Sequence, residues 1–237
     1  MFEESAELYD AIYSFKDYAA EAVQIAELVR AAHPKARNVL DVACGTGEHA
    51  RHLATSHGFN VDGLDLDARL LRVAREKHPS GNFFHADMSD FTLDTRYDIV
   101  LCLFSSIAYL VTFERTRKAL KCFRRHLSQN GVLLVEPWFP PGKLEDGYVS
   151  RHTGMHRGMS VERVSRTEID GRISRLCFDY SINEPGGLRQ ASEVHELGLF
   201  TGGEMAAAFE DAGLRAEFDA VGLTGRGLWI ARSATSK

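Results

Sequence analysis

The stretch NVLDVACGTGE, residues 38–48, decides the fold class of this chain. Its first six residues form a short apolar run, which is typical of a strand buried on both faces of a parallel sheet. Gly45 and Gly47 follow, and glycines at this place allow a tight turn and a close approach of the backbone to a ligand. We expect the turn to lead into a helix near residues 48–57. This order of strand, glycine turn and helix predicts the first unit of an α/β fold.

The residues around this turn limit the kind of ligand that it can bind. Ala50 stands where the G-x-G-x-x-G pattern has its third glycine, so the turn departs from the dinucleotide fingerprint. Asp41 and Glu48 flank the turn, and no basic residue lies between them to meet a pyrophosphate. A zwitterionic or cationic ligand therefore suits this turn better.

Strand and helix patterns alternate from about residue 16 to residue 127. Several of the strand patterns are apolar on both faces, which predicts a parallel sheet covered by helices on both sides. The predicted strands are 38–43, 60–64, 82–85, 97–104 and 131–136, and the predicted helices are 18–32, 48–57, 67–77 and 112–127.

The pattern changes after Pro137. Between residues 176 and 182 apolar and polar side chains alternate with a period of two, which predicts a strand with one apolar face. Similar patterns before and after it predict an inserted antiparallel β-meander at about 150–200, followed by a helix at 202–212 and two final strands. The predicted divisions are an N-terminal ligand-binding core at 1–136, an inserted sheet for substrate covering or dimerisation at 137–200, and a segment that completes the core at 201–237.

Composition excludes several classes of protein. The chain has 237 residues, of which 44% are apolar and 26% charged, and its net charge is −5. An acidic chain without a Lys/Arg block is a poor candidate for binding nucleic acid. No apolar run approaches the roughly 20 residues that span a bilayer, and the acidic N-terminus does not resemble a signal peptide. Four scattered cysteines indicate a reducing, cytoplasmic setting, and scattered histidines give no metal site.

Carboxylates occur at the carboxyl ends of the first three predicted strands. Asp41 lies in the first strand, Asp65 ends the second, and Asp87 follows the third. Because carboxyl ends of parallel strands meet at one edge of a sheet, these side chains should lie together with Gly45 and Gly47. Asp65 stands twenty residues after Gly45, a spacing at which a carboxylate can accept both hydroxyls of a ribose. A carboxylate at Asp87 can read an exocyclic amine.

The motifs DVACGTGEH, GLDLD, ADM and DIVLCLF occur in this order within residues 38–136. They resemble the successive motifs of class I S-adenosylmethionine-dependent methyltransferases, and the resemblance implies a Rossmann-like seven-stranded sheet with the inserted meander. It further implies that S-adenosylmethionine is the cofactor. The implied cofactor-binding residues are Tyr18, Asp41, Ala43, Gly45, Gly47, Asp65, Leu66, Asp87, Met88, Leu103 and Phe104.

A closer resemblance covers nearly the whole chain. The segments LYDAIYSFKDYAAEA, FSSIAYL, VEPWFPP, DGYVS, RVSRT and TGRGLW are similar to those of the nucleotide-linked amino-sugar N,N-dimethyltransferases of macrolide antibiotic biosynthesis. The resemblance implies that Tyr13, Tyr109, Trp138 and Arg226 surround the sugar, and that Tyr18 closes over the cofactor. The implied function is methylation of the amine of a nucleotide-linked amino sugar.

Such a reaction needs alignment more than acid–base chemistry, because a sulfonium already carries an activated methyl group. Tyr13, Glu136 and His195 are the catalytic candidates. Tyr13 can accept a hydrogen bond from the amine or serve as a packing residue. Glu136 either faces the amine or caps neighbouring backbone amides. His195 shares a strand face with Leu197 and Leu199, so it is either a core histidine or a group that relays a proton.

A nucleotide-linked substrate also needs cations for its phosphates. Arg151, Arg163, Arg166 and Arg175 lie in the predicted meander, and guanidinium groups suit phosphate oxygens. We prefer Arg163 together with Arg226 for this role.

Other functions remain open at this stage. One is N- or O-methylation of another small metabolite, such as a heterocycle or an amino acid, and another is non-catalytic binding of S-adenosylmethionine. A nucleic-acid methyltransferase is disfavoured by the acidic charge and because Phe104-Ser105-Ser106 stands where an N/D-P-P-Y/F motif would be expected. Open edges of the predicted meander make a homodimer plausible.

Overall fold

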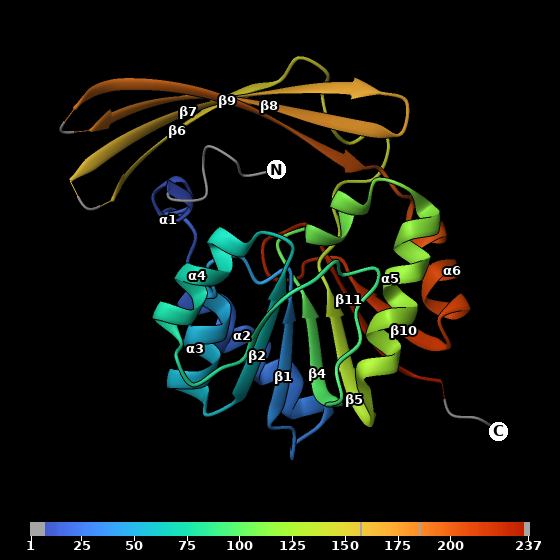
Figure 1. Cartoon of the computed structure of the whole chain (residues 1–237). Helices are drawn as coiled ribbons and strands as arrows, with labels where there is room; N and C mark the ends of the chain where they lie inside the picture. Colours follow the sequence, from blue (N-terminus) through green and yellow to red (C-terminus); the bar gives the residue numbers. More distant parts are fainter. Residues whose placement is uncertain (1–7, 157, 185, 235–237) are drawn as a thin grey trace.

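The computed structural model describes residues 8–156, 158–184 and 186–234. A central sheet flanked by helices forms the core, and a second sheet lies above the carboxyl ends of its parallel strands (Figure 1). The central strands are β1 (Asn38–Val42), β2 (Asn60–Asp65), β3 (Phe83–His85), β4 (Tyr97–Cys102), β5 (Leu127–Val135), β10 (Leu214–Asp219) and β11 (Leu228–Ser233).

The central sheet has seven strands in the order β10-β11-β5-β4-β1-β2-β3. β1 pairs in parallel with β2 and with β4. On the two sides of these strands, β2 pairs in parallel with β3, and β4 pairs in parallel with β5. β11 runs antiparallel to both of its neighbours, β5 and β10. The predicted Rossmann-like, seven-stranded sheet is thus confirmed.

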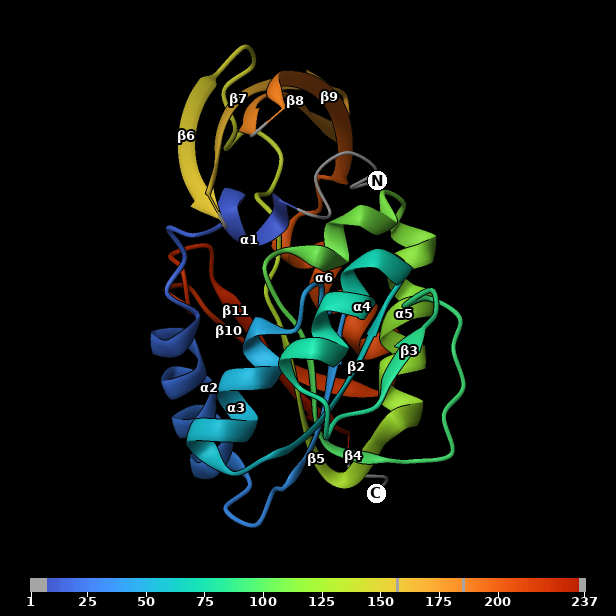
Figure 2. The same cartoon turned by 60° about the vertical axis from the view of Figure 1, so that its left-hand side comes forward.

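Helices cover both faces of this sheet (Figure 2). α2, α3 and α4 share one buried cluster with the strands, and α5 and α6 share another. Local signals fix where several helices begin: the side chains of Asp17, Asp67 and Thr112 cap α2, α4 and α5, and Thr201 forms a capping box with Glu204 on α6. The helices are α1 (Tyr9–Ile12), α2 (Tyr18–Ala32), α3 (Glu48–His57), α4 (Ala68–Lys77), the 3₁₀ helix η2 (Ser106–Leu110), α5 (Phe113–His126) and α6 (Gly202–Asp211).

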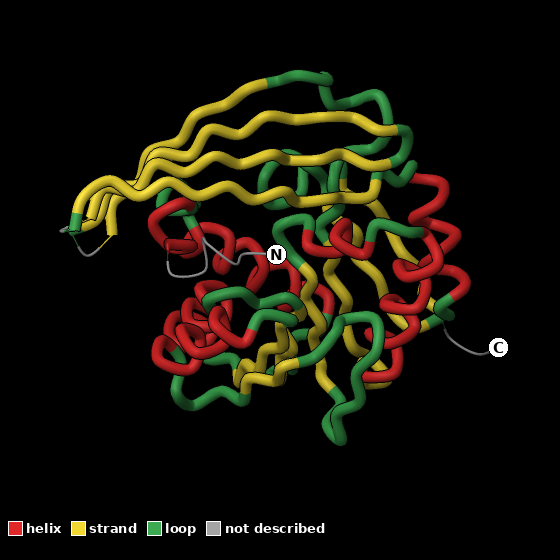
Figure 3. Tube along the Cα trace, turned by 45° about the horizontal axis from the view of Figure 1, so that its top comes forward, coloured by secondary structure: helices red, strands yellow, loops and turns green. Residues whose placement is uncertain are grey.

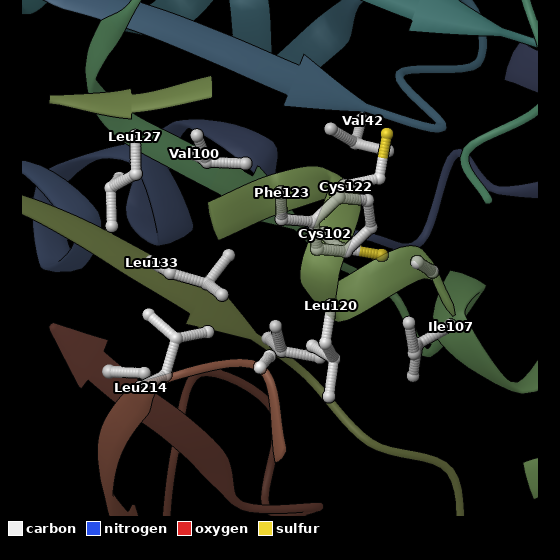
Figure 4. Packing of buried hydrophobic residues seen from close by; sticks show 14 of the residues in the cluster. Val42, Val100, Cys102, Ile107, Leu120, Cys122, Phe123, Leu127, Leu133 and Leu214 are labelled. Atoms are coloured by element: carbon white, nitrogen blue, oxygen red, sulfur yellow. The ribbon is translucent and has the colours of Figure 1, made fainter. Parts of the chain in front are cut away.

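The cluster that includes α5 lies between this helix and the central strands (Figure 4). Val100 and Leu133 project from neighbouring strands toward Phe123 of α5. Each large apolar side chain buried in this way contributes about 1.5–3 kcal/mol to folding. Cys102 and Cys122 belong to the same cluster as free, buried thiols, which confirms their interpretation as small core residues.

The second sheet is the inserted meander, with the strand order β6-β7-β8-β9 and antiparallel pairing throughout. It curves over the core as a long, twisted ribbon (Figure 3). Its strands are β6 (Val149–His156), β7 (Met159–Asp170), β8 (Ile173–Glu184) and β9 (Gly187–Gly198).

The short helix α1 contacts both this sheet and the core. Leu8, Ala11 and Ile12 form a third buried cluster with apolar residues of β7 and β8. Gly154 of β6 permits the contact, because a Cβ atom there would lie only 1.9 Å from the carbonyl oxygen of Ala11. On the other side of α1, Asp10 accepts a hydrogen bond from Thr46 of the glycine turn at 2.7 Å.

The element boundaries differ from the predicted ones at several points. β4 ends two residues before Phe104, because Phe104 and Ser105 adopt positive φ angles of 52° and 60°. β5 begins at Leu127, directly after α5, rather than at residue 131. The meander has four long strands, and α1 is a helix that the sequence did not predict. No helix in the described part of the chain is long and apolar enough to cross a membrane.

Candidate functional site

A cavity of about 610 Å³ lies between the carboxyl ends of the parallel strands and the four-stranded sheet. Its floor is formed by the turns after β1, β2 and β4, and its roof by β6, β7 and β8. A smaller recess of about 30 Å³ lies beside it, and Tyr9, Ala43, Phe104 and Ser106 line both spaces. This is the edge of the sheet where open α/β folds bind ligands.

Asp65 connects the turns after the first two strands. Its Oδ2 accepts a hydrogen bond from the Gly45 amide, and its Oδ1 accepts one from the Asp67 amide, both at 2.9 Å. Burial raises the pKa of Asp65, although these amides oppose the effect. Gly45 and Asp65 both line the large cavity, so the structure brings together two residues that the sequence predicted to be neighbours.

Gly47 has a different role from Gly45. It adopts a left-handed φ of 75° at the start of α3, and a Cβ atom there would lie 3.0 Å from the Cβ of Ala74 on α4. It lines neither space among the described residues, so it shapes the turn without touching either cavity.

Asp41 faces the small recess with an unsatisfied carboxylate oxygen. The residue is 2% exposed, and its Oδ2 has no hydrogen-bond partner in the described part of the chain. Burial raises the pKa of Asp41 to about 6, even though nearby His49 lowers it. A buried carboxylate without a partner is unfavourable, and a cationic group entering the recess would relieve it. Tyr18 and Leu103 also line this recess.

Tyr18 covers the recess through a cluster at the start of α2. Its ring lies 4.9 Å from that of His49, and the Lys16 ammonium lies 5.1 Å from the centre of the Tyr18 ring. Glu21 binds both His49, at 2.8 Å, and Lys16. These contacts fix the segment that closes this end of the site.

The opposite end of the cavity is lined by Leu66, Asp87 and Met88. Leu66 is largely exposed, so its apolar side chain is available for a flat ligand. Asp87 accepts two hydrogen bonds from Ser89 at 2.7 Å and forms an ion pair with Arg115 at 2.8 Å. Arg115 was not predicted from the sequence, because it lies on α5, 28 residues beyond its partner.

An aromatic pair separates the recess from the roof of the cavity. The rings of Tyr13 and Phe104 lie 5.1 Å apart and nearly perpendicular. Phe104 holds its left-handed backbone because its amide donates a hydrogen bond to Oε2 of Glu136 at 2.6 Å. The other oxygen of Glu136 accepts from Thr224 and from Arg226, the latter at 3.3 Å. Glu136 is fully buried and lines neither space, which favours the capping interpretation.

Two arginines flank this aromatic pair. The Arg163 guanidinium carbon lies 5.1 Å from the centre of the Tyr13 ring and 4.8 Å from that of Phe178. Arg163 is 6% exposed, and no described carboxylate lies within ion-pair distance of it. The Arg226 guanidinium carbon lies 5.2 Å from the centre of the Phe104 ring. Both arginines line the cavity.

The other arginines of the meander do not share this position. Arg151 pairs with Glu162 at 3.2 Å, Arg166 pairs with Glu168 at 3.1 Å, and both guanidinium groups are more than half exposed. Arg175 pairs with carboxylates on two strands. Of the four arginines that the sequence analysis grouped together, only Arg163 lines the cavity within the described residues.

Tyr109 and Trp138 complete the wall of the large cavity. The Trp138 indole donates a hydrogen bond to Ser174 at 2.9 Å. The Tyr109 hydroxyl lies 2.8 Å from Nδ1 of His195, which is itself 1% exposed and outside the cavity lining. His195 therefore cannot touch a ligand in this cavity directly, but Tyr109 can.

Comparison with known proteins identifies the family of this chain. A family model described as a methyltransferase domain matches residues 39–131. The chain is 43% identical over 229 residues to the dTDP-3-amino-3,6-dideoxy-alpha-D-glucopyranose N,N-dimethyltransferase of Streptomyces fradiae, covering 95% of this chain and 89% of that protein.

Solved structures give the same result. The crystal structure of DesVI from Streptomyces venezuelae superposes with a TM-score of 0.88 and 40% identity, covering 94% of this chain and 97% of the other. The structure of CalS10 with bound S-adenosylmethionine, described as an amino pentose methyltransferase from Micromonospora echinaspora involved in calicheamicin biosynthesis, superposes with a TM-score of 0.82 and 38% identity, covering 91% of each chain.

Proposed function

Because the chain belongs to the S-adenosylmethionine-dependent methyltransferases, in the family of the dTDP-amino-sugar N,N-dimethyltransferases, we propose that it methylates the amine of a nucleotide-linked amino sugar. One observation carries this proposal: carboxylates line the recess and the floor of the cavity, and Arg163, a buried arginine with no described carboxylate partner, lines its roof. Asp41 and Asp65 suit the amino-acid and ribose parts of the cofactor, and Arg163 suits phosphate oxygens. Antibiotic biosynthesis is the corresponding biological setting.

The residues of the recess fit S-adenosylmethionine. The free Oδ2 of Asp41 can accept a hydrogen bond from the methionyl ammonium group, and Tyr18 covers that position. Asp65 retains lone pairs for the ribose hydroxyls, although each of its oxygens already accepts a backbone hydrogen bond. Leu66 and Met88 offer apolar surface to the adenine. When bound, the cofactor supplies a methyl group that is activated by the sulfonium.

The acceptor would bind under the four-stranded sheet. Arg163 and Arg226 lie on either side of the Tyr13–Phe104 pair, where a diphosphate could accept hydrogen bonds from both. Tyr109 and Trp138 would contact the sugar. We assign Glu136 the role of holding Phe104 and Arg226 in place rather than contacting the amine.

Catalysis in this arrangement rests on alignment. Holding two reactants in a near-attack geometry can supply about 7–11 kcal/mol of the barrier. Burial raises the pKa of Tyr13 despite the nearby Arg163, so its hydroxyl stays protonated at neutral pH. Tyr13 can therefore orient the amine through a hydrogen bond, but it cannot act there as an anionic base.

The exposed residues and the composition support proposals about the oligomeric state, the location and the partners of the protein. Val149, Met155, Leu188 and Val194 are exposed on the four-stranded sheet, whose outer strands also have open edges. These features support a homodimer formed through this sheet.

Free cysteines support a cytoplasmic location, and the acidic net charge of −5 argues against a nucleic-acid partner.

The test is transfer of a labelled methyl group from S-adenosylmethionine to a dTDP-linked amino sugar. We expect labelled product with this acceptor and none with glycine or a heterocyclic amine at the same concentration. Labelling of the amino acid or the heterocycle alone would establish the alternative small-metabolite activity. Tight binding of the cofactor without transfer to any acceptor would instead identify a non-catalytic binding protein.

A further inference from the structure

A buried chain of hydrogen bonds leads from the cavity wall into the four-stranded sheet. The Tyr109 hydroxyl of η2 lies 2.8 Å from Nδ1 of His195 on β9. Nε2 of the same ring lies 3.2 Å from Oε2 of Glu193, two residues earlier on that strand. Tyr109 lines the cavity, whereas the side chains of His195 and Glu193 are 0% and 7% exposed.

We assign the hydrogens of these three groups from the buried end, with Glu193 taken as a carboxylate. A carboxylate only accepts hydrogen bonds, so the hydrogen between His195 and Glu193 is assigned to Nε2. In the neutral ring Nδ1 is then an acceptor, and the Tyr109 hydroxyl donates its single hydrogen to it. Tyr109 consequently presents only oxygen lone pairs to the cavity.

The charged and titratable groups around the chain are compatible with this arrangement. The Tyr180 hydroxyl of β8 donates to Glu193 at 3.3 Å. Arg163 of β7 packs on the Phe178 ring, which lies 4.9 Å from the His195 ring, and its charge opposes the rise in the pKa of Tyr109. Burial, followed by the nearby Tyr13, Tyr180 and Glu193, raises the pKa of Tyr109 well above its ordinary value, so its hydroxyl keeps its hydrogen.

We propose that His195, oriented by Glu193, is a positioning residue that makes the Tyr109 hydroxyl a hydrogen-bond acceptor for the substrate amine. The inference rests on the proposed function, because it requires an amine in the cavity. A neutral amine that donates one N–H to Tyr109 has the direction of its lone pair fixed, and that lone pair must point at the methyl group. Alignment of this kind is the main contribution available to the protein in this reaction.

The first experiment compares His195→Gln, Tyr109→Phe and the double variant, using a dTDP-linked amino sugar that the wild type methylates. We expect His195→Gln to lower kcat about tenfold or less, the effect of losing one net hydrogen bond, with cofactor affinity and acceptor KM nearly unchanged. Since His195 acts through Tyr109, the double variant should be no slower than Tyr109→Phe alone. Tyr97→Phe, which removes a 2.9 Å hydrogen bond to Asp62, is the matched control and should keep wild-type kcat.

The second experiment compares kcat with acceptor KM and cofactor affinity in His195→Gln. Additive losses in the double variant, or a change in KM or cofactor affinity with kcat unaltered in His195→Gln, would overturn the inference. If His195→Gln does not fold, Glu193→Gln serves in the same comparison. Failure of the wild type to methylate the amino sugar would refute the proposed function instead.

Discussion

Replacing Asp41 by asparagine should change stability and cofactor affinity in opposite directions. In the free protein no described residue is a hydrogen-bond partner of Oδ2 of this buried carboxylate, and its pKa is raised from 3.8 to about 6. A shift of this size corresponds to about 3 kcal/mol. Because the folded state binds the proton more tightly than the unfolded state, stability falls as pH rises from about 4 to 6 and stays reduced above that range.

Asparagine does not titrate, so Asp41→Asn should raise the free energy of unfolding at pH 7.5 by up to about 3 kcal/mol. The same change removes the charged acceptor of the methionyl ammonium group, a loss of about 1.5–3 kcal/mol or about 10- to 100-fold in affinity. Urea unfolding of the free protein at pH 5 and 7.5 and calorimetric titration with S-adenosylmethionine measure the two effects.

Asp98→Asn provides a matched control. The Asp98 carboxylate accepts hydrogen bonds from the amides of Arg37 and Asn38 at 2.9 and 3.1 Å, and these hold its pKa below the ordinary value although partial burial alone would raise it. Its replacement should lower stability above about pH 4 and leave cofactor affinity unchanged. The reasoning about Asp41 fails if Asp41→Asn destabilises the free protein at pH 7.5, or if it binds the cofactor as tightly as the wild type.

Three further substitutions test the rest of the site. Asp65→Ala should weaken cofactor binding by about 1–3 kcal/mol, because the ribose hydroxyls lose a charged acceptor; an unchanged calorimetric affinity would contradict the assignment. Arg163→Ala should raise KM for the nucleotide-linked acceptor while cofactor affinity stays nearly constant, and Arg166→Ala, which removes an exposed arginine, should do neither. Tyr13→Phe should lower kcat about tenfold or less, since a general base would contribute about 10²–10⁴-fold, and the pH profile should shift with the pKa of the acceptor amine.

The sequence by itself determined the parallel core and the location of the ligand-binding edge. Both depend on local patterns: apolar runs specify strands that are buried on two faces, and Gly45 can adopt the left-handed φ of 57° that its turn requires. Once the strands are parallel, Asp65 at the end of β2 must lie at the same edge as Gly45. Their hydrogen bond at 2.9 Å is therefore a consequence that the sequence could anticipate.

The sequence could not separate Arg163 from Arg166, because both lie on the same strand and have similar local surroundings. In the folded chain Arg163 points into the cavity beside Tyr13, while Arg166 lies exposed beside Glu168. A spacing of three residues places two side chains on opposite faces of a strand, but only the position of the core decides which face is covered.

The tertiary structure also decided which groups act together. Tyr109 lies in the 3₁₀ helix η2 and His195 on β9 of the four-stranded sheet, 86 positions apart, yet their side chains form one hydrogen bond. The sequence does not reveal the free Oδ2 of Asp41 either, because it is free only if none of the neighbouring described elements places a hydrogen-bond donor beside it. Local propensity specifies elements, whereas the pairing and burial of polar groups arise only when elements distant in the chain are brought into contact, and those contacts set the chemistry of the site.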